Sequence, residues 1–215
     1  MASRPLPTAA PSVLARLESL GAQVVLCPRR AEDPPGDPCL HRFREALAAG
    51  AVPFAVQGPA NAWCLDGGRT LGWELATVPF DRLFVQVGGG ALAACVGRGL
   101  IEAGHPAVVH TVQTEGCAPL ERAWRLAGDD RADAATRWPE LMWPWEAEPS
   151  SAADGILDDE TYDWLGDFAA MQATGGWPVV ASEPDVVRAH ELLGRCTTID
   201  ASATGTSGLA GLLAV

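Results

Sequence analysis

The chain contains 215 residues, of which 48% are apolar and 20% charged, so it has enough apolar side chains for a core and is not of the disordered type. Its net charge of −12 argues against partners that are themselves negatively charged, namely nucleic acid and anionic membranes. All 15 basic side chains are arginine, and the sequence contains no lysine.

The first fifty residues predict a disordered terminus followed by a small folded part. Residues 1–10 are rich in proline and alanine, and we expect them to be disordered. Apolar residues at helical spacing predict a helix over 12–20 with Ser12 as its N-cap. The run 24–26 is typical of a buried strand, and a proline-rich turn precedes a helix predicted over 39–49.

The middle of the chain alternates between strands and helices. The sequence predicts, in order, an extended segment at 52–56, a helix at 70–76, a strand at 83–87, a helix at 91–103, a strand at 108–112 and a helix at 120–126. Such alternation with glycine-rich links is typical of a parallel sheet whose two faces are both covered by helices. We therefore predict an α/β fold, a three-layer α-β-α parallel sheet.

An acidic, tryptophan-rich insertion at about residues 128–157 interrupts this alternation. Between residues 129 and 167 there are twelve acidic residues and only two arginines, which favours a solvated acidic surface. Trp138, Trp143 and Trp145 are expected to pack on a neighbouring element or across the mouth of an active site, because exposed tryptophans are rare. Beyond the insertion the sequence predicts a helix at 158–173, a strand at 179–180, a helix at 183–193 and a glycine-rich turn that opens a last helix before residue 215.

No signal peptide or membrane span is predicted. The N-terminal residues lack an apolar region, and no apolar run is long enough to cross a bilayer. We expect a cytoplasmic protein.

The strongest motif for ligand binding joins a predicted strand to the helix that follows it. Gly88, Gly89, Gly90 and Ala91 come directly after the strand at 83–87 and open the helix at 91–103. Glycines let the backbone turn sharply, and the unpaired amides and dipole of a helix N-terminus favour negative charge. The motif predicts a phosphate site; the alternative is a tight turn that binds nothing.

A dinucleotide is a second ligand class for the same loop. Gly88, Gly90 and Ala93 satisfy the spacing G-x-G-x-x-A, and Glu115 follows the next predicted strand. In a Rossmann domain, however, this loop usually follows the first strand, whereas here several predicted elements precede it. A nicotinamide or flavin cofactor is therefore the weaker alternative.

The remaining polar candidates have simpler structural explanations. The histidines at 41, 105, 110 and 190 are scattered, and His110 lies in an apolar strand, where a hydrogen-bonded core histidine is expected. Helix capping and a solvated face explain Asp66 and Glu74. No cysteine pair or cysteine–histidine pair has zinc-binding spacing. The sequence predicts no metal ligand and no catalytic residue.

Five segments together resemble a known enzyme family. They are, in chain order, 14–26 with its Leu-Gly-Ala step, 57–75 with Thr70 and Glu74, the glycine loop in 83–92, the strand at 109–116, and 206–211 with Ser207. In the same order they are similar to segments of the fold-type II pyridoxal-phosphate-dependent enzymes. This family includes threonine synthase, the threonine and serine dehydratases, cysteine synthase and the tryptophan synthase β chain. The pattern around Thr70 and Glu74 is most similar to threonine synthase and threonine dehydratase.

The resemblance implies an incomplete fold-type II domain. Residues 11–50 would be the remnant of the family's small domain, and residues 51–215 the large domain with the acidic insertion. The resemblance also implies pyridoxal 5'-phosphate as cofactor, a small amino acid as substrate, and β-elimination or replacement as the reaction. The residues it assigns to the cofactor are Gly88, Gly89, Gly90, Ala91 and Ser207.

The absence of lysine conflicts with that chemistry. In the family, a lysine in a Ser-x-Lys segment forms the Schiff base with the cofactor, and that segment precedes the region matched here. Arginine cannot replace the lysine, because its guanidinium stays protonated. We therefore predict a truncated member that is inactive alone and needs a lysine-bearing partner chain. The alternatives are a non-catalytic phosphate-binding or oligomerisation module, such as a homodimer that uses the tryptophans at 138–145, and a nucleotide-binding domain.

Overall fold

The computed structural model describes residues 11–30, 32–129 and 131–215, which fall into two units. The first unit reaches to Val52 and holds α1 (Pro11–Ser19) and α2 (Pro38–Ala48). The second begins at Pro53 and holds the other helices and strands. The predicted disorder of residues 1–10 lies outside the described residues.

Two local predictions for the first unit are wrong. Helix α1 already begins at Pro11, so Ser12 lies inside the helix and is not its N-cap. The segment 24–26 pairs with no strand among the described residues, and its side chains Val25 and Leu26 are exposed. By contrast, α2 begins as expected: its N-cap, Asp37, accepts a hydrogen bond from the Cys39 amide at 2.8 Å.

The second unit is built on a parallel sheet of three strands, β1 (Arg82–Gln86), β2 (Val108–Thr114) and β3 (Val179–Ala181). Strand β2 lies in the middle and pairs in parallel with both neighbours. Six of its seven residues are buried, which is typical of a strand covered on both faces. The prediction of a parallel sheet is confirmed.

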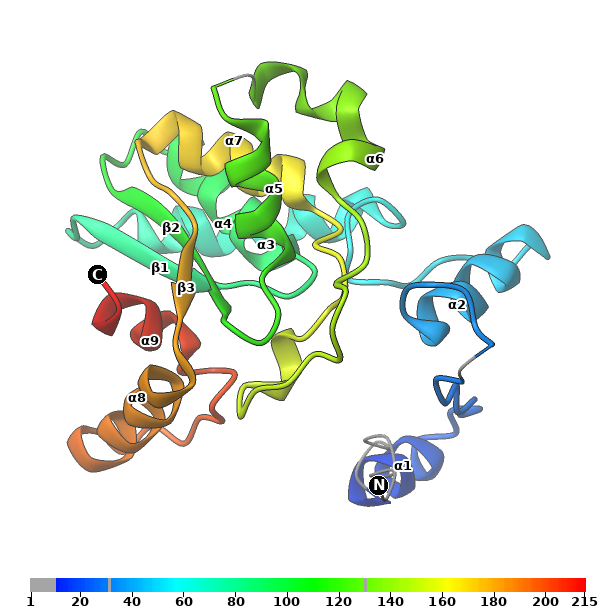
Figure 1. Ribbon diagram of the computed structural model, residues 1–215. Helices are drawn as coiled ribbons and strands as arrows, with labels where there is room; N and C mark the ends of the chain where they lie inside the picture. The colour runs from blue at the N-terminus through cyan, green and yellow to red at the C-terminus, as the bar shows by residue number, and fades with distance from the viewer. Residues whose placement is uncertain (1–10, 31, 130) are drawn as a thin grey trace. The chain divides into compact units, whose positions relative to one another are not determined.

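Helices cover both faces of this sheet, as Figure 1 shows. On one face, α4 (Ala91–Glu102) packs against β1 and α7 (Trp164–Thr174) against β2, with α3 (Ala62–Leu75) outside α4. On the other face, α9 (Ser207–Leu213) contacts all three strands, and α8 (Glu183–Cys196) packs on α9. The three-layer architecture is therefore confirmed.

Each face of the sheet has its own apolar core. On the face of α4 and α7, Val85 lies in a cluster with Trp164 and Phe168, whose rings meet edge to face at 5.0 Å. Helix α5 (Pro119–Ala127) contributes Leu120 to the same cluster. On the face of α9, Val112 packs with residues of β3, α8 and α9, namely Ala181, Val186 and Ala210. Burial on both faces fixes the ends of the strands in space.

The insertion at 128–157 contains only short elements, η1 (Arg131–Arg137), α6 (Trp138–Leu141) and η2 (Asp154–Ile156). Its tryptophans pack within the chain, as expected. Trp138 meets Trp164 at 5.3 Å between ring centroids. Trp143 and Trp145 lie against Arg122 of α5, whose guanidinium carbon is 3.9 Å and 5.2 Å from the two ring centroids. The insertion is thus part of the fold of the second unit.

The helix predicted at 158–173 begins later than expected. Helix α7 starts at Trp164, and the residues before it run as turns alongside the glycine loop. Asp158 and Asp159, which a helix starting at residue 158 would place in its first turn, therefore precede the helix. Among the described residues, no helix combines the length and hydropathy needed to cross a membrane.

Candidate functional site

The predicted phosphate loop connects β1 to α4 at the carboxyl end of the sheet. The Val87 amide still bonds to the Val112 carbonyl at 2.8 Å, and the chain then leaves the sheet through Gly88 and Gly89. Gly90, with φ of +95°, is the N-cap of α4, a backbone conformation that L side chains rarely adopt. The structure thus brings Gly88, Gly89, Gly90 and Ala91 together at a helix N-terminus, the geometry that suits an anion.

The space beside this loop is filled by the residues that lead into α7. A Cβ atom built on Gly88 would collide with the Asp158 carboxylate. One on Gly89 would lie 3.1 Å from the Tyr162 ring, and one on Gly90 would lie 2.5 Å from Asp167 Oδ2. The glycines therefore permit close contact with the chain's own side chains, two of which carry carboxyl groups.

Asp163 fastens this segment to the loop. Its backbone amide donates to the Gly89 carbonyl at 2.8 Å, and its carboxylate accepts from the Gly58 amide at 3.0 Å. Burial raises the pKa of Asp163, whereas the hydrogen bond from Gly58 lowers it. The segment from Ile156 to Asp167 is called the acidic strap below.

Asp167 is the most unusual group at the site. It lies in the first turn of α7 and is fully buried, and neither carboxylate oxygen has a hydrogen-bond partner among the described residues. Burial, and then the nearby Asp163, raises the pKa of Asp167 well above its ordinary value. Burial without a partner therefore favours the protonated form of this group, since the charged form is costly to bury.

Asp163 and Asp167 were not singled out from the sequence. They are four residues apart, so they share one face of a helix, and their neighbours Trp164 and Phe168 are buried. An acidic pair at this spacing inside an apolar stretch was the available signal. It was hidden by the many other acidic residues of the region.

Ser207, the fifth predicted cofactor residue, is turned towards its own helix. It is buried at the start of α9, and its hydroxyl donates to the Ala203 carbonyl at 2.9 Å. Its link to the loop is indirect. The turn before α9 accepts, through Thr204 Oγ1, a hydrogen bond from the Gly155 amide at 3.0 Å, and the next residue, Ile156, lies beside Gly88.

His110 is a core histidine, as predicted. Its ring stacks on Phe84 at 4.8 Å and meets Trp177 edge to face at 4.3 Å. Its Nδ1 lies 3.2 Å from the Trp177 carbonyl, while Arg82 Nη1 lies 3.1 Å from Nε2. These partners match a neutral ring that donates through Nδ1 and accepts at Nε2. Burial lowers the pKa of His110, which also favours the neutral form.

The other sequence candidates have structural roles. Asp66 forms an ion pair with Arg69 at 2.9 Å on the surface of α3, and Glu74 lies exposed near the end of the same helix. Glu115 accepts a hydrogen bond from the Glu183 amide at 2.8 Å, so it caps the start of α8. No group of three or more metal-binding side chains gathers anywhere in the described residues.

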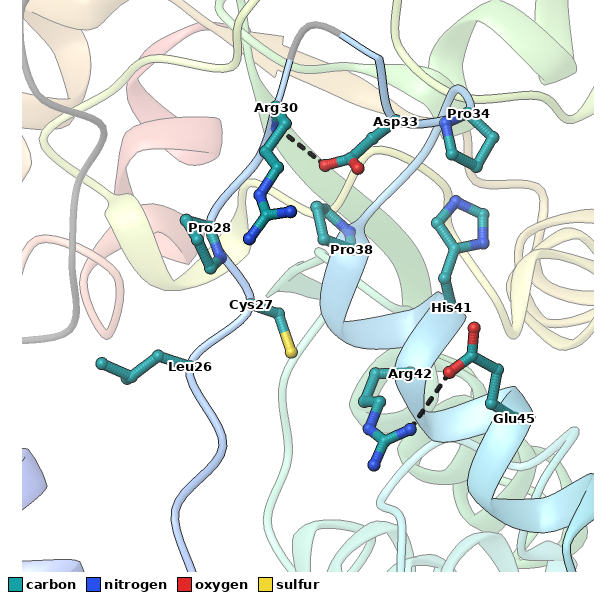
Figure 2. A pocket seen from close by; sticks show the side chains of 10 residues that line it. All are labelled: Leu26, Cys27, Pro28, Arg30, Asp33, Pro34, Pro38, His41, Arg42 and Glu45. Carbon is teal, nitrogen blue, oxygen red and sulfur yellow. Dashed lines mark hydrogen bonds and ion pairs between the residues drawn. The ribbon is translucent and has the colours of Figure 1, made fainter.

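The first unit has a pocket of its own, shown in Figure 2, with a volume of about 400 Å³. It lies between the extended segment before α2 and α2 itself, and its lining includes Cys27, Arg30, Asp33, His41, Arg42 and Glu45. Both of its carboxylates have local partners, since Asp33 accepts a hydrogen bond from the Arg30 backbone amide at 2.7 Å and Glu45 forms an ion pair with Arg42 at 3.2 Å. The pocket presents no unpaired carboxylate.

Comparisons with known proteins give one family model and several solved structures of similar fold. A family model described as "pyridoxal-phosphate dependent enzyme" matches residues 6–215. The fold is similar to maize serine racemase (TM-score 0.68, 18% identity, 95% of this chain and 56% of that chain). It is also similar to threonine deaminase isoform 2 from Solanum lycopersicum (TM-score 0.68, 17% identity, 97% and 52%) and to the threonine deaminase of T.th. (TM-score 0.54, 24% identity, 70% and 52%).

The chain spans between 52% and 56% of the length of these three solved structures. No match was found among curated proteins. At these identities the solved structures show the fold, and the family model supports pyridoxal phosphate over a dinucleotide as the ligand class.

The structure allows the fit of pyridoxal phosphate to be tested. The backbone of the loop suits a phosphate, because Gly90 opens a helix of 12 residues. The surrounding side chains do not, because carboxyl groups of Asp158 and Asp167 stand where the glycines leave room. The chain also has no lysine to hold the cofactor covalently. In the arrangement that this structure shows, the residues around the loop do not fit the cofactor.

Proposed function

Because this chain belongs to the family of pyridoxal-phosphate-dependent enzymes, whose cofactor is pyridoxal 5'-phosphate, we propose that it is the phosphate-loop half of an amino-acid lyase and is inactive alone. The reaction type we propose is that of threonine synthase or of the threonine and serine dehydratases, β-elimination or replacement on a small amino acid. The glycine loop at the start of α4, which such a half must supply, supports this assignment.

The proposed inactivity rests on the absence of lysine from all 215 residues. The family's chemistry needs a neutral primary amine, and the 15 arginines cannot supply one because a guanidinium is always protonated. We propose that a second polypeptide supplies the lysine. In that assembly the amides of Gly88, Gly89, Gly90 and Ala91 would hold the phosphate once the acidic strap has moved. Ser207 stays a weaker candidate, since its hydroxyl is engaged by Ala203.

A reducing, cytoplasmic location is part of the same proposal. All six cysteines are free thiols, which is the usual state of cysteines in the cytoplasm. An extracellular form of the protein in which pairs of these cysteines are oxidised would contradict this proposal.

The test is an assay of the purified chain with pyridoxal phosphate and either L-threonine or L-serine, in which 2-oxo acid is measured. We expect no product above a protein-free control, whereas the T.th. threonine deaminase serves as the positive control. Adding a lysine-bearing polypeptide from the same genome that covers the missing half should restore turnover. Product formation by the chain alone would overturn the proposal.

A second candidate function, an association module, is favoured by exposed apolar side chains. Phe54 is 99% exposed and Trp63 is 85% exposed, although such residues rarely face water unless they bind a partner. Trp143 and Trp145 are poorer candidates for that role, because they pack on Arg122. Sedimentation of the wild type and of a Phe54→Ser/Trp63→Ser variant tests this candidate. A self-associating wild type and a monomeric variant would support it, and identical monomeric profiles would count against it.

A further inference from the structure

The glycine loop is in contact with carboxyl groups rather than with cations. Around a phosphate-binding loop one expects arginine, lysine or hydroxyl side chains, since these neutralise or donate to the anion. Here the positions beside Gly88 and Gly90 are taken by Asp158 and Asp167. Asp163 also borders the loop, because a Cβ on Gly90 would be 3.3 Å from its Cβ. Three acidic side chains therefore border one helix N-terminus.

The acidic strap is held against the loop by specific bonds. The Asp163 amide bonds to the Gly89 carbonyl at 2.8 Å, and its carboxylate bonds to the Gly58 amide at 3.0 Å. At its other end the strap is anchored by Cys117, whose thiol donates to the Asp158 carbonyl at 3.3 Å. These contacts come from separate parts of the second unit, so the strap is fixed at several points.

Asp167 is aimed into this site without a partner. It is fully buried, neither of its oxygens is hydrogen-bonded among the described residues, and Oδ2 is the atom that a Cβ on Gly90 would meet at 2.5 Å. A buried polar group without a partner is costly, so its retention in a core position needs an explanation. Its carboxyl group lies beside the N-terminus of α4, which favours negative charge.

We infer that in the chain alone the acidic strap closes the glycine loop to phosphate, with the carboxyl groups of Asp158 and Asp167 standing in the space that a phosphate group would need. The strap thereby keeps a free half of the lyase from taking up pyridoxal phosphate. The inference rests on the proposed function only in treating this loop as the family's phosphate loop. It gives Asp167 a role although the group has no hydrogen-bond partner among the described residues, since its carboxyl group takes up space beside Gly90.

Two properties of a phosphate make the closure effective. A Cβ atom built on Gly89 or Gly90 would lie only 2.5 to 3.3 Å from atoms of the strap, so the strap leaves no room for a phosphate group on that side of these two glycines. A phosphate is also a dianion, so that Asp158 and Asp163 would repel it through a medium of low dielectric constant. Removal of the carboxyl groups should therefore open the loop in two ways, because it frees space for the phosphate and removes negative charge that repels it.

The experiment measures the binding of inorganic phosphate and of pyridoxal phosphate to the wild type and to an Asp158→Ala/Asp167→Ala variant by isothermal titration calorimetry. Pyridoxal, which lacks the phosphate, is the control ligand. The chain has no lysine, so pyridoxal phosphate cannot attach to side-chain amines and obscure the result. Asp154→Ala is the matched control variant, because it removes an exposed carboxylate that is not among the atoms nearest to the glycines of the loop.

We expect no measurable phosphate binding by the wild type or by the Asp154 variant. The double variant should bind phosphate and pyridoxal phosphate, but not pyridoxal, with an affinity at least about tenfold above the detection limit. A cooperative thermal melt verifies that each variant folds. Should this double variant not fold, the single variant Asp158→Ala, which removes both the volume and the charge of the less buried carboxylate, takes its place.

Saturable binding of pyridoxal phosphate by the wild type would overturn the inference and leave the proposed function intact. Folded variants that still bind no phosphate would also overturn it, since the carboxyl groups would then not be what closes the loop. The proposed function fails on a different result, namely formation of 2-oxo acid by the chain alone.

Discussion

Gly72 of α3 and Gly99 of α4 face each other where these two helices cross. A Cβ on Gly72 would lie 2.8 Å from the Gly99 Cα, and a Cβ on Gly99 would lie 3.0 Å from the Gly72 Cα. The two backbones therefore touch with no side chain between them. Because α4 carries the glycine loop at its N-terminus, this contact fixes the position of the candidate site.

Substitution of Gly99 should loosen this crossing. In Gly99→Ala the new methyl group collides with the Arg69 carbonyl, and overpacking of this kind costs about 1–3 kcal/mol of unfolding free energy. Urea unfolding gives the value. The control is Gly67→Ala on the open side of α3, where no atom lies within 4 Å. It should stabilise the protein by about 0.5–1 kcal/mol, because alanine favours a helix. Equal effects of both substitutions would refute the proposed contact.

Asp167 should make the protein less stable as the pH rises. Its pKa in the folded state is raised by burial and by Asp163, so above about pH 4 the folded chain holds a proton that the unfolded chain has lost. Stability then decreases from about pH 4 up to the pKa of the folded state. Asp167→Asn removes this penalty, and Asp163 is present in both proteins. Melting temperatures measured from pH 4 to 8 should diverge in favour of the variant; parallel curves would contradict a raised pKa.

Arg122 should hold the tryptophans of the insertion in place. Its guanidinium pairs with Glu146 at 2.8 Å, donates to the Trp143 carbonyl and stacks on the Trp143 ring. Arg122→Ala should cost about 2–4 kcal/mol, and Arg122→Lys should recover less than half of that loss because an ammonium cannot stack as a plane. Denaturant unfolding measures both.

The matched control for that prediction is Arg125→Ala in the same helix. Arg125 is largely exposed and lies 3.7 Å from Glu121, so its loss should cost less than about 1 kcal/mol. A loss at Arg122 as small as that at Arg125 would mean that the stacking adds no stability.

Cys117 should be chemically inert in the folded protein. Burial, with Asp159 and Asp158 nearby, raises the pKa of this thiol to about 12, so the reactive thiolate is scarce at neutral pH. Cys196 is exposed at the end of α8. Brief treatment with iodoacetamide followed by peptide mass spectrometry should find Cys196 modified and Cys117 unmodified, and both modified in urea. Rapid labelling of Cys117 without denaturant would show that the strap opens readily.

The sequence correctly predicted those elements in which the spacing of apolar residues agrees with the positions of the glycines that bound the element. Strand β1, the glycine loop and α4 were found because a short apolar run, three glycines and a helical apolar face follow one another. Helix α3 was predicted only in its second half, from residue 70, whereas it begins at Ala62 and includes Gly67 and Gly68. Gly68 lies against Cys95, so the glycine serves helix packing. A single sequence does not reveal which contact a glycine permits.

Of the candidate site, the sequence predicted only the residues whose backbone forms the glycine loop. The loop residues were found from the glycine pattern, whereas Asp163 and Asp167 were missed because their role depends on burial. Of the many acidic residues in this region, only the fold decides that Asp167 is fully buried. The failed strand at 24–26 has a similar cause, because an apolar run becomes a strand only where a sheet accepts it.

Val112 is paired on both sides, to Gln86 of β1 and to Val179 of β3. It is the last residue of β2 in the pairing with β1 and the first in the pairing with β3. The long connection between β2 and β3 contains the acidic insertion, and it must close before β3 can pair. Closing such a loop is slow because the contacts join residues far apart in the sequence, and the self-repulsion of its carboxylates slows it further. The sheet of this chain should therefore assemble in two kinetic stages, β1 with β2 first and β3 afterwards, with the second stage accelerated by salt.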